Sequence, residues 1–62
     1  MAEEARQAEA ERLRMAAARG MLGTLQRDRM PEYLWEGALA ESFGRRIARA
    51  ILQEYESSKE GD

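Results

Sequence analysis

The chain has 62 residues and a formal net charge of −2. A chain this short buries only about 60% of the surface that its unfolded form exposes, so its core is small. Apolar residues make up 44% of the sequence, but 11 of them are alanine, which buries little area. Valine is absent, and the β-branched residues are two isoleucines and one threonine. Because strands favour β-branched residues, this composition excludes a sheet and predicts an all-α chain.

The composition also restricts the chemistry. Cysteine and histidine are both absent, which excludes disulfides and leaves only carboxylates as zinc ligands, so we expect no metal and no cofactor. The N-terminus lacks the basic and apolar regions of a signal peptide. The longest uncharged run, residues 20–26, falls far short of the ~20 residues that span a bilayer. We therefore expect a cytoplasmic protein that does not enter the membrane.

The first predicted helix covers about residues 3–27 and has two different halves. Residues 2–12 are all Ala, Glu, Arg or Gln, with pairs such as Glu9 and Arg12 at i,i+3 that support a solvated helix. Larger apolar side chains begin at Leu13. The pattern predicts an exposed or frayed arm at residues 2–12, followed by a half that packs against other parts of the protein.

Two glycines interrupt the apolar half of this helix. Gly20 and Gly23 each destabilise a helix interior by about 1 kcal/mol, so their presence requires a reason. On a helical projection both lie near Ala16, which forms a smooth strip that a partner helix could approach closely. Alternatively, Gly20 ends a shorter helix and residues 20–24 form a loose joint. The sequence leaves both interpretations open.

A bend at residues 28–30 divides the chain before its single proline, Pro31. Proline is favoured at the first position of a helix, and it disfavours helical geometry in the residue before it. We therefore predict a second helix at about residues 31–57 and a polar tail at 58–62. Because the connection is short, the two helices are expected to form an antiparallel hairpin, with residues 1–62 as a single domain.

The second predicted helix carries most of the apolar surface, on a face about 160° wide that runs from Tyr33 to Ile51. The residues that fall outside this face are Leu34, Ala38, Ala48, Leu52 and Tyr55. The first helix has too few large apolar residues to cover all of it, so we expect a homodimer or higher oligomer, or a larger protein partner. The candidate protein interface is Leu13, Met21, Leu25, Tyr33, Trp35, Leu39, Phe43, Ile47 and Ile51.

Nine of the ten basic residues are arginine, and five of them suggest an alternative interface with nucleic acid. These candidates are Arg27, Arg29, Arg45, Arg46 and Arg49. The competing interpretation pairs Arg45 with Glu41 at i,i+4 and leaves the other arginines solvated. The net charge of −2 gives no general attraction to nucleic acid.

Residues 39–44, Leu-Ala-Glu-Ser-Phe-Gly, resemble the second helix and turn glycine of a helix-turn-helix. Ala40 and Gly44 fit that pattern, whereas position 50 is alanine in place of isoleucine or valine. The resemblance implies that the arginines at 45, 46 and 49 face a DNA groove. The competing interpretation is one continuous helix, with Gly37 and Gly44 as small contact residues.

An enzyme is not indicated, because paired carboxylates such as Glu32 and Glu36 are common on solvated helices. We expect a small non-enzymatic regulator, inhibitor or assembly factor, of the kind that phages and mobile elements often encode, acting by protein binding. The alternative is a small DNA- or RNA-binding regulator. In architecture alone, the predicted hairpin is similar to the Rop-type hairpin dimers that bind RNA.

Overall fold

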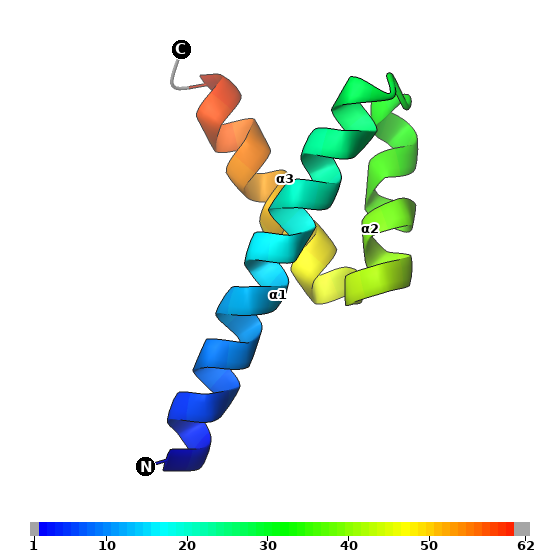
Figure 1. Ribbon diagram of the computed structural model, residues 1–62. Helices are drawn as coiled ribbons and strands as arrows, with labels where there is room; N and C mark the ends of the chain where they lie inside the picture. Colours follow the sequence, from blue (N-terminus) through cyan, green and yellow to red (C-terminus); the bar gives the residue numbers. More distant parts are fainter. Residues whose placement is uncertain (1, 61–62) are drawn as a thin grey trace.

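The computed structural model describes residues 2–60, and this part of the chain is helical without any strand. It contains α1 (Ala2–Arg27), the short 3₁₀ helix η1 (Glu32–Leu34), α2 (Trp35–Phe43) and α3 (Arg45–Glu60). Figure 1 shows that α2 runs back beside the C-terminal half of α1, and that α3 then crosses α1. The all-α class predicted from composition is confirmed.

Helix α1 sets the length of the molecule. Its 26 residues span about 39 Å at 1.5 Å per residue, and the largest dimension of the structure is 41 Å. The N-terminal half of the helix projects away from the other helices (Figure 1), and every residue from 2 to 10 is exposed. This segment is helical and solvated, as expected for its composition.

Helix α1 ends in a Schellman motif that orients the turn. The Met30 N–H donates to the Leu25 carbonyl and the Arg29 N–H donates to the Gln26 carbonyl, each at 3.0 Å. Arg29 has a φ of 61°, a left-handed conformation that such motifs usually assign to glycine. Met30 is half-buried against the core. The chain therefore reverses direction here without a glycine.

The expected continuous helix at residues 31–57 is wrong, because the chain bends sharply at Gly44. This residue has φ 89° and ψ 157°, a combination that is essentially restricted to glycine. Its N–H donates to the Ala40 carbonyl at 2.8 Å, and its own carbonyl accepts from the Ala48 N–H at 3.0 Å. The single residue therefore ends α2 and begins α3.

The C-terminal boundary also differs from the prediction. Helix α3 continues to Glu60, so residues 58–60 of the expected polar tail are helical. The remaining tail residues, 61–62, lie outside the described part of the chain.

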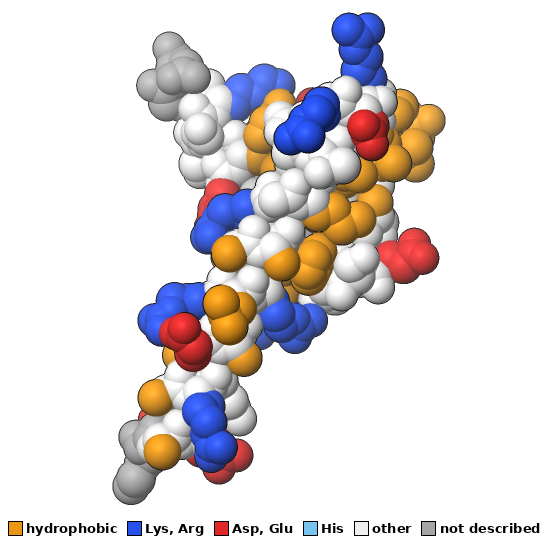
Figure 2. Space-filling view, viewed as in Figure 1, with side chains coloured by type: hydrophobic (Ala, Val, Ile, Leu, Met, Phe, Trp, Pro, Cys, Tyr) orange, Lys and Arg blue, Asp and Glu red, His pale blue; other side chains and the backbone are white. Residues whose placement is uncertain are grey.

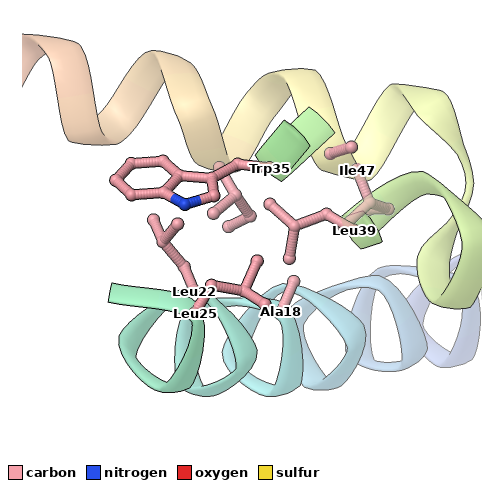
Figure 3. Packing of buried hydrophobic residues seen from close by; sticks show 8 residues of the cluster. Ala18, Leu22, Leu25, Trp35, Leu39 and Ile47 are labelled. Atoms are coloured by element: carbon pink, nitrogen blue, oxygen red, sulfur yellow. The ribbon is translucent and has the colours of Figure 1, made fainter. Parts of the chain in front are cut away.

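The core lies where the three α-helices meet. Figure 3 shows Ala18, Leu22 and Leu25 of α1 pointing toward Trp35 and Leu39 of α2, with α3 on the opposite side. The buried hydrophobic residues are Ala18, Leu22, Leu25, Trp35, Leu39, Ile47, Ala48 and Ile51. Ala48, expected outside the apolar face, is fully buried because the bend at Gly44 changes the direction in which α3 presents its residues.

Trp35 contacts both the turn before α2 and helix α3. Its Nε1–H donates to the Met30 carbonyl at 2.8 Å, which satisfies the polar atom of a side chain that is otherwise buried. The ring meets Tyr55 of α3 edge to face, with 5.3 Å between the centroids and 82° between the planes. Nζ of Lys59 lies over the Tyr55 ring, 5.8 Å from its centroid.

The two glycines of α1 do not serve as close contacts within the chain. The helix passes through Gly20 and Gly23 without interruption, so the alternative interpretation as a loose joint is wrong. A Cβ atom added at either position would meet nothing within 4 Å. Close packing against a second chain at this strip therefore stays a prediction.

Candidate protein-interaction surface

Most of the candidate interface is buried inside a single chain. Leu25, Trp35, Leu39, Ile47 and Ile51 all belong to the core. We expected helix α1 to be too small to cover the apolar face of one long helix, so that a second chain would be needed to cover it. The bend at Gly44 folds α3 against α2 instead, so the two halves of that face cover each other and these five residues are not available to a partner in this conformation.

The other candidates remain at the surface to different degrees. Tyr33 is 83% exposed and Leu13 is 63% exposed. Met21 and Phe43 are half-buried and pack against the core from its edge. Leu34, which we placed outside the apolar face, is also exposed, at 45%.

The exposed and half-buried residues near the turn form the best candidate for a binding surface, which we call the turn patch: Met30, Tyr33, Leu34 and Ala38. Tyr33 and Leu34 lie side by side in η1, and Ala38 follows Leu34 by one helical turn. Figure 2 shows hydrophobic side chains gathered at this end of α2 and along its boundary with α1. Tyrosine and methionine are enriched in protein interfaces, so the composition of the patch suits a protein partner.

The turn patch differs chemically from the exposed leucine on α1. Leu13 lies among the charged and small residues of the projecting helix, whereas Tyr33 and Leu34 adjoin half-buried residues that contact the core. A partner that covers Tyr33 and Leu34 can therefore extend its contact onto an apolar surface that is already ordered. Ordering costs fall when the contacted side chains are fixed before binding.

The arginines proposed for nucleic acid do not form one basic surface. Arg46 forms an ion pair with Glu11 of α1, and the Nε of Arg49 lies 3.4 Å from Oε2 of Glu36 in α2. Both pairs join different helices. Within residues 2–60, Arg45 has no ion pair, so the expected pairing with Glu41 is not formed.

The remaining candidate arginines are separated by the length of α2. Arg27 and Arg29 lie at the turn before this helix, whereas Arg45 lies just after it. Nine helical residues span about 14 Å. The helix-turn-helix resemblance correctly marked Gly44 as a break, but one residue separates α2 and α3 where that motif has a turn of three to four.

Two further polar contacts hold α1 against the other helices, and sequence spacing could not reveal them. Arg19 binds Glu54 of α3 through two hydrogen bonds, Nε to Oε1 at 2.7 Å and Nη2 to Oε2 at 2.9 Å. These hydrogen bonds lower the pKa of the Glu54 carboxyl and raise the pKa of the Arg19 guanidinium, with a smaller opposing effect of desolvation. The partners are 35 residues apart, so no local pattern pointed to this pair.

The second contact ties α1 to the bend. Nη2 of Arg14 donates to the Phe43 carbonyl at 2.6 Å. This carbonyl belongs to the last turn of α2, where the helix dipole and the free backbone acceptors favour a positive charge. Arg14 therefore caps α2 from a different helix, at the position where the chain turns into α3.

The described residues contain no cluster of three or more Asp and Glu side chains that could hold a metal ion. In the same part of the chain, none of the helices combines the length and apolarity needed to cross a bilayer. The chain matches no protein-family model, and no curated protein or solved structure is significantly similar to it.

Proposed function

We propose that this chain is a small non-enzymatic regulator or assembly factor that binds another protein through the turn patch. The observation that carries the proposal is the exposure of Tyr33 and Leu34, which immediately precede the buried Trp35 in the chain. A 62-residue chain has few large apolar side chains, and placing two of them in water next to Trp35 gives no stability to the isolated fold. A partner that covers them gains the hydrophobic contribution that the fold does not use.

The charges near the turn patch suggest the chemistry of the partner. Arg27 and Arg29 are exposed at the adjoining turn and form no ion pair within residues 2–60. An apolar surface beside two free guanidinium groups suits an amphipathic helix with leucine or aromatic residues on one face and carboxylates at its edge. Arg27 and Arg29, first considered for nucleic acid, would then contact the protein partner.

The test uses two exposed leucines with different surroundings. Leu34→Glu places a charge in the turn patch, and Leu13→Glu places the same charge on the projecting half of α1. We expect both variants to keep the helical circular dichroism spectrum of the parent chain. The partner would be identified with a photo-crosslinking amino acid at position 33, and its dissociation constant measured by calorimetry with purified proteins.

We expect Leu34→Glu to weaken binding at least tenfold, which corresponds to about 1.4 kcal/mol, while Leu13→Glu leaves the affinity unchanged. Equal affinities for both variants would exclude the turn patch as the binding site. The same samples test the rival function in nucleic-acid binding. If the bound molecule is RNA or DNA and its affinity falls steeply with salt, the protein-binding proposal is wrong.

A further inference from the structure

The apolar pattern of the sequence and the path of the chain disagree at Gly44. Trp35, Leu39, Phe43, Ile47 and Ile51 follow one another at intervals of four residues, which places them along one face of a straight helix. This spacing continues across Gly44 without a shift. The structure nevertheless bends at this residue. The same side chains are therefore covered because α3 folds back against α2, and they do not lie along a straight helix.

A change at one residue is sufficient to convert the bent form into a straight one. Helical geometry extends to Phe43 on one side and resumes at Arg45 on the other. Gly44 already donates to Ala40 and accepts from Ala48 in the pattern of an α-helix. Because glycine populates positive and negative φ about equally, rotation of its backbone into the helical region meets little intrinsic resistance.

The bent form leaves backbone groups without their helical partners. Within residues 2–60, the N–H groups of residues 45–47 have no backbone acceptor, since they begin α3. The Phe43 carbonyl accepts from Arg14 instead of from the N–H of Ile47. Straightening the chain would pair these three N–H groups with the carbonyls of residues 41–43, so the straight form gains backbone hydrogen bonds.

Straightening has a large cost if the chain stays alone. Ile47, Ala48 and Ile51 of α3 are at most 3% exposed, and a straight α2–α3 helix would carry them away from α1. The interhelix pairs Arg19–Glu54 and Arg46–Glu11 would break at the same time. The surface thus uncovered on α1 and α2 is complementary in shape and charge to an α3 helix. A second copy of the chain supplies such a helix.

We infer that this protein forms a dimer in which two copies straighten at Gly44 and exchange their α3 helices. Each α3 then occupies, on the second copy, the place that it holds here on its own chain. The contacts of the core and the ion pairs with α1 are formed again between chains, and the backbone hydrogen bonds at residues 45–47 are added. Exchange of an identical element in this way is a low-cost route to a dimer.

This dimer is independent of the proposed binding function. The residues of the turn patch precede Gly44. They therefore keep their positions beside α1 of the same chain in both forms. Loss of partner binding in Leu34→Glu would therefore leave the exchange unaffected. Conversely, a chain that never dimerises can still bind a partner through the patch.

The test uses chains made by chemical synthesis, which the length of 62 residues permits. Gly44→Ala disfavours the positive φ of the bend and favours the straight helix, since L-residues avoid that region. A D-alanine at position 44 has the opposite preference and favours the bend. Gly37→Ala is the matched control, because Gly37 lies inside α2 and its added Cβ meets nothing within 4 Å.

Association would be measured by sedimentation equilibrium over a range of concentrations. We expect Gly44→Ala to raise the association constant at least tenfold, the D-alanine chain to lower it at least tenfold, and Gly37→Ala to match the parent chain. A Gly44→Ala chain that is helical and monomeric at every concentration would overturn the inference. So would a D-alanine chain that dimerises as strongly as the parent.

A second measurement identifies the exchange itself and does not depend on how Gly44→Ala folds. The chain has no cysteine, so a copy carrying Arg19→Cys can be mixed with a copy carrying Glu54→Cys and treated with a short bis-maleimide. These positions pair across α1 and α3, and exchange brings them together between copies. We expect a covalent heterodimer joined at 19 and 54. A dimer that sediments as such but gives no such product would contradict α3 exchange.

Discussion

Residues 2–10 and residues 18–25 belong to one uninterrupted helix, but their environments differ. Every residue in the first stretch is exposed, whereas Ala18, Leu22 and Leu25 in the second are buried against α2 and α3. An isolated helix shorter than about 12–15 residues is marginal in water, because forming its first turn is unfavourable. The comparison indicates that the packed half supplies the nucleus and that the exposed half extends it one residue at a time.

The side chains of the exposed half fit this interpretation. Arg12 and Glu9 form an ion pair one turn apart on the helix surface, and such pairs contribute about 0.2–0.5 kcal/mol each. At the boundary between the halves, Glu11 forms an ion pair with Arg46, and Arg14 donates a hydrogen bond to the Phe43 carbonyl. The transition from solvated to packed helix is therefore marked by the first side chains that bind another helix.

The largest expected effect comes from removing a core leucine. Leu39 is fully buried between the helices, and its replacement in Leu39→Ala should lower the free energy of unfolding by about 2–5 kcal/mol. At roughly 0.05–0.15 kcal/mol per residue, the whole chain has only about 3–9 kcal/mol of stability. We expect Leu39→Ala to lose a large fraction of this stability, which urea titrations at 25 °C followed by circular dichroism would measure.

Leu13→Ala is the matched control for this experiment, since Leu13 lies near the exposed half of α1. Its unfolding free energy should stay within about 0.5 kcal/mol of the parent value. If both leucine variants lost similar stability, Leu13 would be packed in solution, and the contrast between the two halves of α1 would be incorrect.

Two alanine-to-glycine substitutions compare the halves of α1 directly. Ala18→Gly should lower the free energy of unfolding by roughly 2 kcal/mol in total. The lower helix propensity of glycine accounts for about 1 kcal/mol, and the loss of a buried methyl group for about 0.8 kcal/mol. Ala8→Gly has the same propensity effect in the exposed half. There the helix can fray locally without unfolding the core, so we expect its urea midpoint to match that of the parent.

Amide hydrogen exchange would show where the difference arises. Ala8→Gly should lower protection within residues 2–12, and Ala18→Gly should lower protection throughout the chain. A common loss of global stability in both variants would mean that the exposed half unfolds together with the core, and not before it.

The fold class followed from the sequence because it depends on composition and local patterning. The scarcity of β-branched residues indicated helices, and the Ala, Glu and Arg content of residues 2–12 indicated an exposed helical arm. Both properties are decided within a few residues of chain. The place where α1 ends was also local, since it lies at the charged segment that precedes Pro31.

The bend at Gly44 could not be decided in the same way. Glycine is compatible with a helix interior and with a positive φ, and the apolar spacing around it favoured the straight form. Within one chain, contacts between distant residues stabilise the bent form, and Ala48 is buried by them. Consequently, five of the nine predicted interface residues are in the core, and the exposed Leu34 was missed.

The smallest expected effect is a pH dependence from the Arg19–Glu54 ion pair. Hydrogen bonds from Arg19 lower the pKa of Glu54 in the folded state. A carboxyl with a lowered folded pKa stabilises the fold above its unfolded pKa, which is about 4.3 for glutamate, and this contribution is lost as the pH falls through the folded value. In Glu54→Gln the contribution is absent at every pH.

We therefore expect the difference in melting temperature between the parent and Glu54→Gln to be small at pH 7. It should disappear as the pH falls through the folded pKa of Glu54. Because both side chains are about half exposed, 0.5 M salt should reduce the difference as well. Glu56→Gln is the control, since Glu56 lies on the same helix and forms no ion pair within residues 2–60. Its melting temperature at pH 7 should match that of the parent chain. A pH-independent difference for Glu54→Gln would mean that Arg19 does not hold the carboxylate in solution, and that the crossing of α1 and α3 depends on the core alone.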